Sequence, residues 1–141
     1  MKTIFYLGVV SICTLFFSCS DKQTENGFEY NQAFIMKYGT TYTHNTDNLT
    51  IEIKSIQEER CPKDVDCIWE GRAFITFIVN NSEEITSTIK GLCFDLASTC
   101  GKQIEGMTIK IHAMLLNPYK DKESVIIPLE DYRCTLVVSK K

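Results

Sequence analysis

The sequence has few of the residues that interrupt regular structure. Seven glycines and three prolines among 141 residues leave little room for a long linker, and the length suits one domain. The formal charge of -3 is small, which argues against a nucleic-acid partner. Composition alone therefore predicts a single globular domain that does not bind nucleic acid.

Histidine is scarce too, with two in the chain. A hydrolase that works through a nucleophile needs a base oriented beside it. His44 falls in a polar stretch and His112 on the outward face of a predicted strand, so we expect both at the surface. Neither has a Gly-x-Ser-x-Gly or Cys/His context, and no enzyme is predicted.

Long apolar runs are absent except at the N-terminus. The run Thr3–Phe17 follows a lysine and is too short for a comfortable membrane span. It ends at Ser18-Cys19, which resembles a bacterial lipobox. Residues 1–18 are predicted to be a lipoprotein signal peptide, with Cys19 as the lipid attachment site. A plain secretory signal cut near Ser18 is the alternative.

The polar stretch 19–27 reads as a flexible tether, and residues 28–141 as the single β domain. Ser20 and the acidic residues that follow resemble the start of lipoproteins sent to the outer membrane or the cell surface. We expect a lipid-anchored protein of the bacterial cell envelope, in the outer membrane, with the membrane as one partner.

Seven cysteines suggest an oxidising compartment. Cys13 would leave with the signal peptide and Cys19 would carry the lipid, so five cysteines remain for disulfides. The predicted bridges are Cys61–Cys67 and Cys93–Cys100, both closing short loops, with Cys134 on an inward strand face as a small hydrophobe. A bridge from Cys134 to Cys93 or Cys100 stays open as an alternative. The spacing does not fit a zinc site, and no metal or cofactor is expected.

Period-2 alternation predicts about seven short strands and no helix after the signal. They cover 33–37, 49–53, 67–79, 85–92, 107–115, 124–127 and 132–139. A bulge is expected at Ser55-Ile56 and a turn at Asn80–Ser82. This pattern indicates a small antiparallel β-sandwich, immunoglobulin-like or open-barrel-like. Tyr132 could serve as a corner tyrosine that bonds backbone through its hydroxyl.

The stretch Arg60–Val79 contains the most hydrophobic strand of the mature chain. Counted in steps of two from Cys67, one face carries Trp69, Gly71 and then apolar residues only. Because Trp69 falls on the same face as these apolar residues, we expect it to be buried against the Cys61–Cys67 bridge, with Gly71 leaving room for the indole.

The segment 59–73 resembles a signature of small secreted and lipid-anchored bacterial proteins, Arg-Cys-Pro, Asp-Val, then Cys-x-Trp-x-Gly-x-Ala. A later Pro118-Tyr119 step and Asp131-Tyr132 also match the group. Glu59 departs from it, standing where a serine is usual. The resemblance covers the chain from Phe34 onward and implies a fold and a compartment. It implies no reaction, because no activity is established for the group.

Several carboxylates surround the Cys61–Cys67 loop. They could bind Ca²⁺, or pair with Arg60, Lys63 and Arg72 on a solvated rim, which the absence of an EF-hand spacing favours. The loop itself could be a recognition element, through Pro62, Lys63, Asp64 and Asp66.

Together these features predict a non-catalytic binding or accessory module whose partner is an unknown envelope protein or glycan. The alternative is a disulfide-loop inhibitor or recognition protein that acts on an envelope hydrolase.

Overall fold

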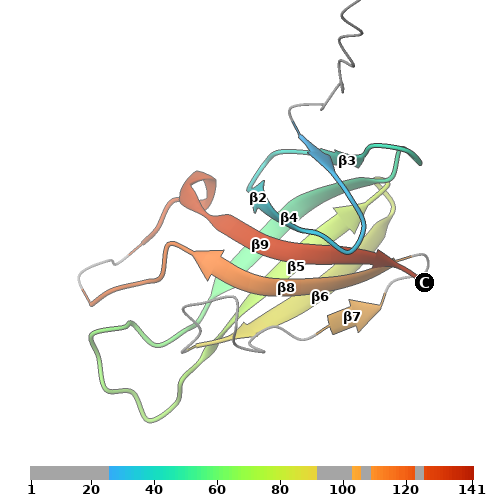
Figure 1. Ribbon diagram of the computed structural model, residues 1–141. Coiled ribbons are helices and arrows are strands. Elements are labelled where there is room, and N and C mark those ends of the chain that lie inside the picture. Colours follow the sequence, from blue (N-terminus) through green and yellow to red (C-terminus); the bar gives the residue numbers. More distant parts are fainter. Residues whose placement is uncertain (1–25, 92–102, 106–108, 123–125) are drawn as a thin grey trace, which may run out of the picture.

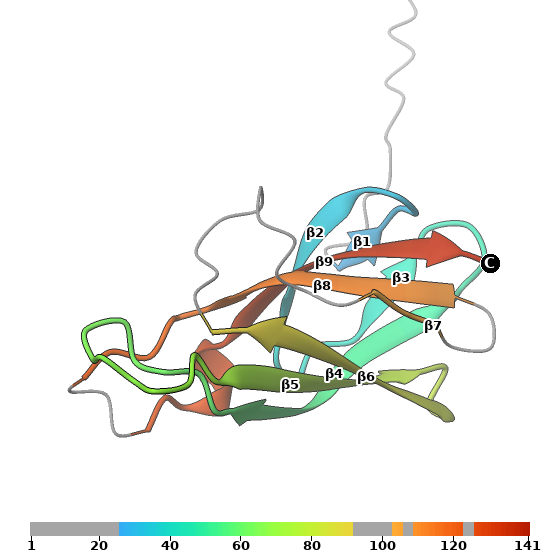
Figure 2. The same cartoon turned by 90° about the horizontal axis from the view of Figure 1, so that it is seen from below.

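The computed structural model describes residues 26–91, 103–105, 109–122 and 126–141, which form two β-sheets packed face to face (Figures 1 and 2). One sheet has the strand order β1-β3-β4-β5-β6 and the other β2-β9-β8-β7. The strands are Gly27–Phe28 (β1), Ala33–Lys37 (β2), Tyr42–His44 (β3), Thr50–Glu58 (β4), Arg72–Val79 (β5), Glu83–Lys90 (β6), Gln103–Glu105 (β7), Ile109–Asn117 (β8) and Arg133–Lys140 (β9). All pairs are antiparallel except β1 with β3. The predicted all-β sandwich is confirmed.

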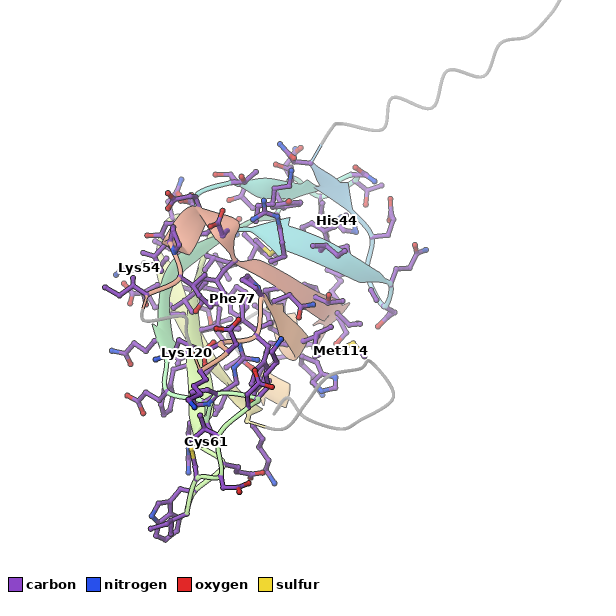
Figure 3. The ribbon with its side chains drawn as sticks, turned by 90° about the vertical axis from the view of Figure 1, so that its left-hand side faces the viewer. His44, Lys54, Cys61, Phe77, Met114 and Lys120 are labelled. Carbon is purple, nitrogen blue, oxygen red and sulfur yellow. A yellow bond between two sulfur atoms is a disulfide. The ribbon has the colours of Figure 1, made fainter. Side chains whose placement is uncertain are left out.

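The core lies between the two sheets, because alternate residues of each long strand point inward. In β5 the inward residues are Ala73, Ile75, Phe77 and Val79, all buried. In β9 they are Cys134, Leu136 and Val138, also buried. Phe77 lies near the centre of the molecule, between the two sheets (Figure 3). Burial of these apolar rows is the main stabilising contribution to the fold.

Two local irregularities were predicted, and both are present. Asn80 and Asn81 link β5 to β6 with positive φ angles of 48° and 56°, which asparagine tolerates better than most residues. The β4–β5 pairing shifts register between Ile53 and Ser55, next to the predicted bulge. The bulge reverses which residues of β4 face inward just before the disulfide loop.

A second bulge was not predicted. The β8–β9 pairing shifts register between Ala113 and Leu115, so the alternation expected through Leu115 breaks there. Leu116 is buried instead, and Leu115 is half-buried. The strand expected at 124–127 lies partly outside the described residues, and Ile126 and Ile127 belong to no strand. A short 3-10 helix at Leu129–Asp131 leads into β9.

The two ends of the sandwich carry different segments. Gly27 of β1 pairs with Thr43, and Thr43 pairs with Thr50, the first residue of β4. The disulfide loop follows Glu58, the last residue of β4. The start of the described chain and the loop therefore lie at opposite ends of β4. His44 and Cys61 mark these ends in Figure 3. Within the described segments, no helix is long and apolar enough to cross a bilayer.

Candidate functional site

The loop that joins β4 to β5 projects from one end of the sandwich (Figures 1 and 3). It is closed by a disulfide between Cys61 and Cys67, whose Cα atoms are 6.1 Å apart, as predicted. Cys61 is buried and Cys67 is exposed. The bridge thus fastens the outer half of the loop to a fixed point at the end of the sandwich.

The side chains beyond the bridge point into solvent. Ile68 is 93% exposed, Trp69 is 82% exposed and Val65 is 40% exposed. The prediction that Trp69 is a core residue packed on the disulfide was wrong. Strand β5 begins at Arg72, so the period-2 pattern does not extend back to Cys67. We call Val65, Ile68 and Trp69 the apolar tip of the loop.

Gly71 has a structural role, although not the predicted one. Its φ angle of +66° lies in the left-handed region and ends the extended backbone there. A Cβ atom at this position would lie 2.0 Å from the carbonyl oxygen of Glu59. The glycine therefore allows the two arms of the loop to approach closely, and it does not make room for the indole.

Arg60 is the central residue at the base of the loop. Only 2% of it is exposed, whereas a solvated ion pair was predicted, and that prediction was wrong. Its Nε donates to Glu58 Oε1 at 2.7 Å, and its Nη1 donates to the Leu116 carbonyl at 3.0 Å. Its guanidinium lies over the Tyr119 ring, 4.3 Å from the centroid. A buried arginine needs such a set of partners to offset its desolvation.

Tyr119 and its neighbour Lys120 brace the loop from the other sheet. The Tyr119 hydroxyl contacts two backbone carbonyls, that of Cys61 at 2.9 Å and that of Gly91. The Lys63 amide donates to the Lys120 carbonyl at 3.1 Å. Burial raises the pKa of Tyr119. The arms of the loop are also paired directly, since the Cys61 amide donates to the Glu70 carbonyl at 3.0 Å.

Tyr132 is buried, as expected of a corner residue. The expected bond from its hydroxyl to the backbone stays a prediction, and the Glu58 side chain lies nearby. Burial, followed by the nearby Glu58 charge, raises the pKa of Tyr132 to about 12. Glu58 therefore lies beside both Arg60 and Tyr132, which places the 3-10 turn before β9 next to the foot of the disulfide loop.

The other predicted cysteines have different outcomes. Cys134 is a free, fully buried thiol on the inward face of β9, as predicted. Burial raises its pKa to about 12. Cys19, Cys93 and Cys100 lie outside the described residues, so the lipid attachment and the second bridge stay predictions.

The predicted recognition residues lie on this loop. Lys63, Asp64 and Asp66 are exposed, and Pro62 is half-buried beside Cys61. No group of three or more His, Cys, Asp or Glu side chains in the described part of the chain could hold a metal ion.

His44 was expected at the surface and is buried, with 3% exposed, so that prediction was wrong. It is the last residue of β3, and its ring stacks on Tyr30 at 3.9 Å between centroids. Its Nδ1 contacts Asp47, and its buried Nε2 lies 3.6 Å from Glu29 without a hydrogen-bond partner. His112, on β8, is half-buried.

Sequence reasoning missed a second group of exposed apolar residues. Ile126 and Leu129 lie before and within the 3-10 turn, at the loop end of the sandwich (Figure 1). They line an open pocket of about 190 Å³ together with Ile56, Ile127, Glu58 and Lys120. Leu129 belongs to no predicted strand, and only the folded chain brings it to the same pocket as Ile126. We call Ile126 and Leu129 the ledge.

Comparisons with known proteins identify no relative: no protein-family model, no curated protein and no solved structure matches the chain.

Proposed function

We propose that this protein is a non-catalytic, lipid-anchored module of the bacterial cell envelope that binds a partner through its disulfide-closed loop. One observation carries the proposal: Ile68 and Trp69 are almost fully exposed on a loop that is braced at its base. An exposed pair of large apolar side chains costs free energy in water, and contiguous apolar patches mark interaction sites.

The bracing supports a binding role, because an ordered loop loses less entropy when it binds. The disulfide, the Arg60 contacts and the Tyr119 hydroxyl all act below the tip and leave the tip itself free. A loop that served only as a connection would not need these contacts. Aromatic residues presented in this way are frequent hot spots of protein interfaces.

The proposed anchor fits the arrangement of the ends. β1 begins at Gly27, close in sequence to Cys19, and lies at the end of β4 opposite the loop. A protein held by lipid at Cys19 would present the loop on the side away from its own anchor. Partners would then reach the loop without competition from the membrane surface.

The non-catalytic part of the proposal is supported by His44. Its Nε2 is sealed from solvent, so it cannot exchange a proton with a bound substrate in this conformation. The carboxylates on the loop, Asp64 and Asp66, are exposed, and neither lines the pocket beside the ledge. Carboxylates that act in hydrolysis lie in concave sites that exclude water.

A second candidate function is an inhibitor of an envelope hydrolase. The projecting loop favours it, because inhibitors insert a rigid loop into an active-site cleft. The two candidate functions differ in which loop residue contributes most to partner binding. An inhibitor that offers Lys63 to a hydrolase loses its activity with Lys63→Ala, whereas the proposed module loses binding with Trp69→Ala and keeps it with Lys63→Ala.

Two experiments test the proposal. Metabolic labelling with a fatty acid should mark the parent and not Cys19→Ala, which should move to the soluble fraction; label on the variant would contradict the anchor. An affinity pulldown from envelope extract should retain the same partner with the parent and with Ile35→Ala, an exposed site on β2, and lose it with Trp69→Ala. Equal capture by both variants would contradict the role of the loop.

A further inference from the structure

We infer that the apolar tip inserts into an apolar pocket of a partner protein whose rim carries lysine or arginine side chains. This inference rests on the proposed function and names the chemistry of the partner. It depends on the shape of the tip, the charges around it and its position relative to the N-terminal strand.

The shape of the tip requires a concave partner. Val65, Ile68 and Trp69 are exposed on the loop that projects from the end of the sandwich. An aliphatic side chain and an indole side by side form a three-dimensional knob. A flat saccharide surface buries one aromatic face well, but it leaves Ile68 in water. A protein pocket can enclose both side chains, and burying an indole in such a pocket contributes strongly to affinity.

Carboxylates outnumber cations around the tip, where Lys63 and Arg72 are the flanking exposed cations. The segment from Asp64 to Glu70 contains three exposed carboxylates, with Asp66 as the third, and no cation. A partner pocket with a basic rim complements these charges and steers the encounter. Anionic lipid headgroups would repel them, and membrane-binding segments carry lysine or arginine at this position instead.

The ledge extends the contact on the same end of the sandwich. Ile126 is 83% exposed, and Leu129 lies next to the open pocket that Lys120 lines. The Lys63 amide donates a hydrogen bond to the carbonyl of Lys120. Lys120 also lines the pocket beside Ile126 and Leu129, so it contacts both the loop and the ledge pocket. Five of the six large exposed apolar residues of the described chain belong to the tip and the ledge. The exception, Ile35, lies in β2.

The test is site-specific photocrosslinking of the full chain in the envelope fraction. Benzoylphenylalanine replaces Ile68, which leaves Trp69 intact, and a control chain carries it in place of Ile35. We expect an adduct with one protein from position 68 only, removed by excess unlabelled parent. Trp69→Ala in the same chain should lower the adduct yield by about 30-fold, the loss expected of an interface hot spot.

Charge dependence separates the inference from the proposed function. Asp64→Asn with Asp66→Asn should lower the yield about fivefold at low salt and much less at high salt. The matched control is Glu52→Gln with Glu84→Gln, which removes the same charge from the outer face of the sandwich and should not change the yield. If the adduct yield depends on Trp69 but does not change when the loop carboxylates are removed, the partner's pocket has no basic rim, and only this part of the inference is wrong. No adduct at all, or one that Trp69→Ala does not weaken, would overturn both proposals.

Trp69 also reports directly on lipid, because it is the only tryptophan in the chain. Vesicles of phosphatidylethanolamine and phosphatidylglycerol should leave its emission and its quenching by acrylamide unchanged. A blue shift with vesicles, or a photoadduct whose mass is that of a lipid or a glycan, would overturn the inference in favour of that ligand.

Discussion

The Arg60 guanidinium lies over the Tyr119 ring beneath the disulfide loop, with its central carbon 4.3 Å from the ring centroid. They come from segments far apart in the chain, one following β4 and the other following β8. The contact joins the two sheets at the end where the loop projects. The shape of the loop therefore depends on this cation-π pair as well as on its own disulfide.

Arg60→Met should remove about 3–5 kcal/mol from the free energy of unfolding, because it leaves the Glu58 carboxylate unpaired and largely buried. The matched control is Lys54→Met, which breaks an exposed pair with Glu84 and should cost at most about 1 kcal/mol. Urea unfolding of both variants measures the difference. Equal losses would contradict the buried character of the Arg60 pair.

Gly71→Ala should destabilise the fold by about 3 kcal/mol or more. The change forces a Cβ atom against the Glu59 carbonyl and adds left-handed strain. Gly39→Ala is the control, since Gly39 has a similar φ of +69° and nothing within 4 Å of the added atom. It should cost about 1–2 kcal/mol, the strain alone. If both alanine variants unfold at the same urea concentration, close approach does not explain Gly71.

Trp69→Ala should change the free energy of unfolding by no more than about 0.5 kcal/mol, because the indole touches little of the fold. Phe77→Ala, which empties the centre of the core, should cost about 3–5 kcal/mol. A large loss of stability with Trp69→Ala would mean that the indole packs on the loop in solution.

Cys67→Ser should lower the free energy of unfolding by about 2 kcal/mol, because the loop is no longer closed by the disulfide.

Alkaline pH should weaken the fold through Tyr132. Its pKa is about 12 in the folded chain and about 10 when unfolded. A raised pKa contributes stability below pH 10, and this contribution is lost as the pH rises from 10 to 12. Tyr132→Phe should flatten the decline in unfolding free energy over this range. Loss of the hydroxyl should cost at most about 1 kcal/mol at neutral pH. A decline unchanged by the substitution would contradict the assignment.

Cys134 should resist alkylation in the folded protein, because its thiol is fully buried and its pKa is about 12. Iodoacetamide at pH 8, followed by peptide mass mapping, should leave Cys134 unmodified until urea is added. Labelling then follows the small population of unfolded chains, so the destabilised Gly71→Ala variant should be labelled faster than the parent. Rapid labelling of Cys134 in the folded parent would show that β9 opens locally.

Much of the fold was predictable from local patterns. The alternation in β5 and β9, the Asn80-Asn81 turn and the bulge in β4 all depend on residues close in sequence. The Cys61–Cys67 bridge was predictable for the same reason, because so short a loop is easily closed. These features follow from backbone geometry, which repeats with a fixed period as long as the chain stays extended.

The candidate site was largely not predictable, because it depends on where those patterns stop. Trp69 fits an inward position of β5 until Gly71 turns the backbone, and no property of the tryptophan reveals this. Arg60 looks like a surface charge in sequence, yet the Leu116 carbonyl and the Tyr119 ring allow it to be buried. The sequence by itself determined the long strands, the Asn80-Asn81 turn and the Cys61–Cys67 bridge, through contacts between near neighbours. Only the tertiary structure decided which side chains are buried at the loop base and which remain in water at its tip, because distant segments provide those partners.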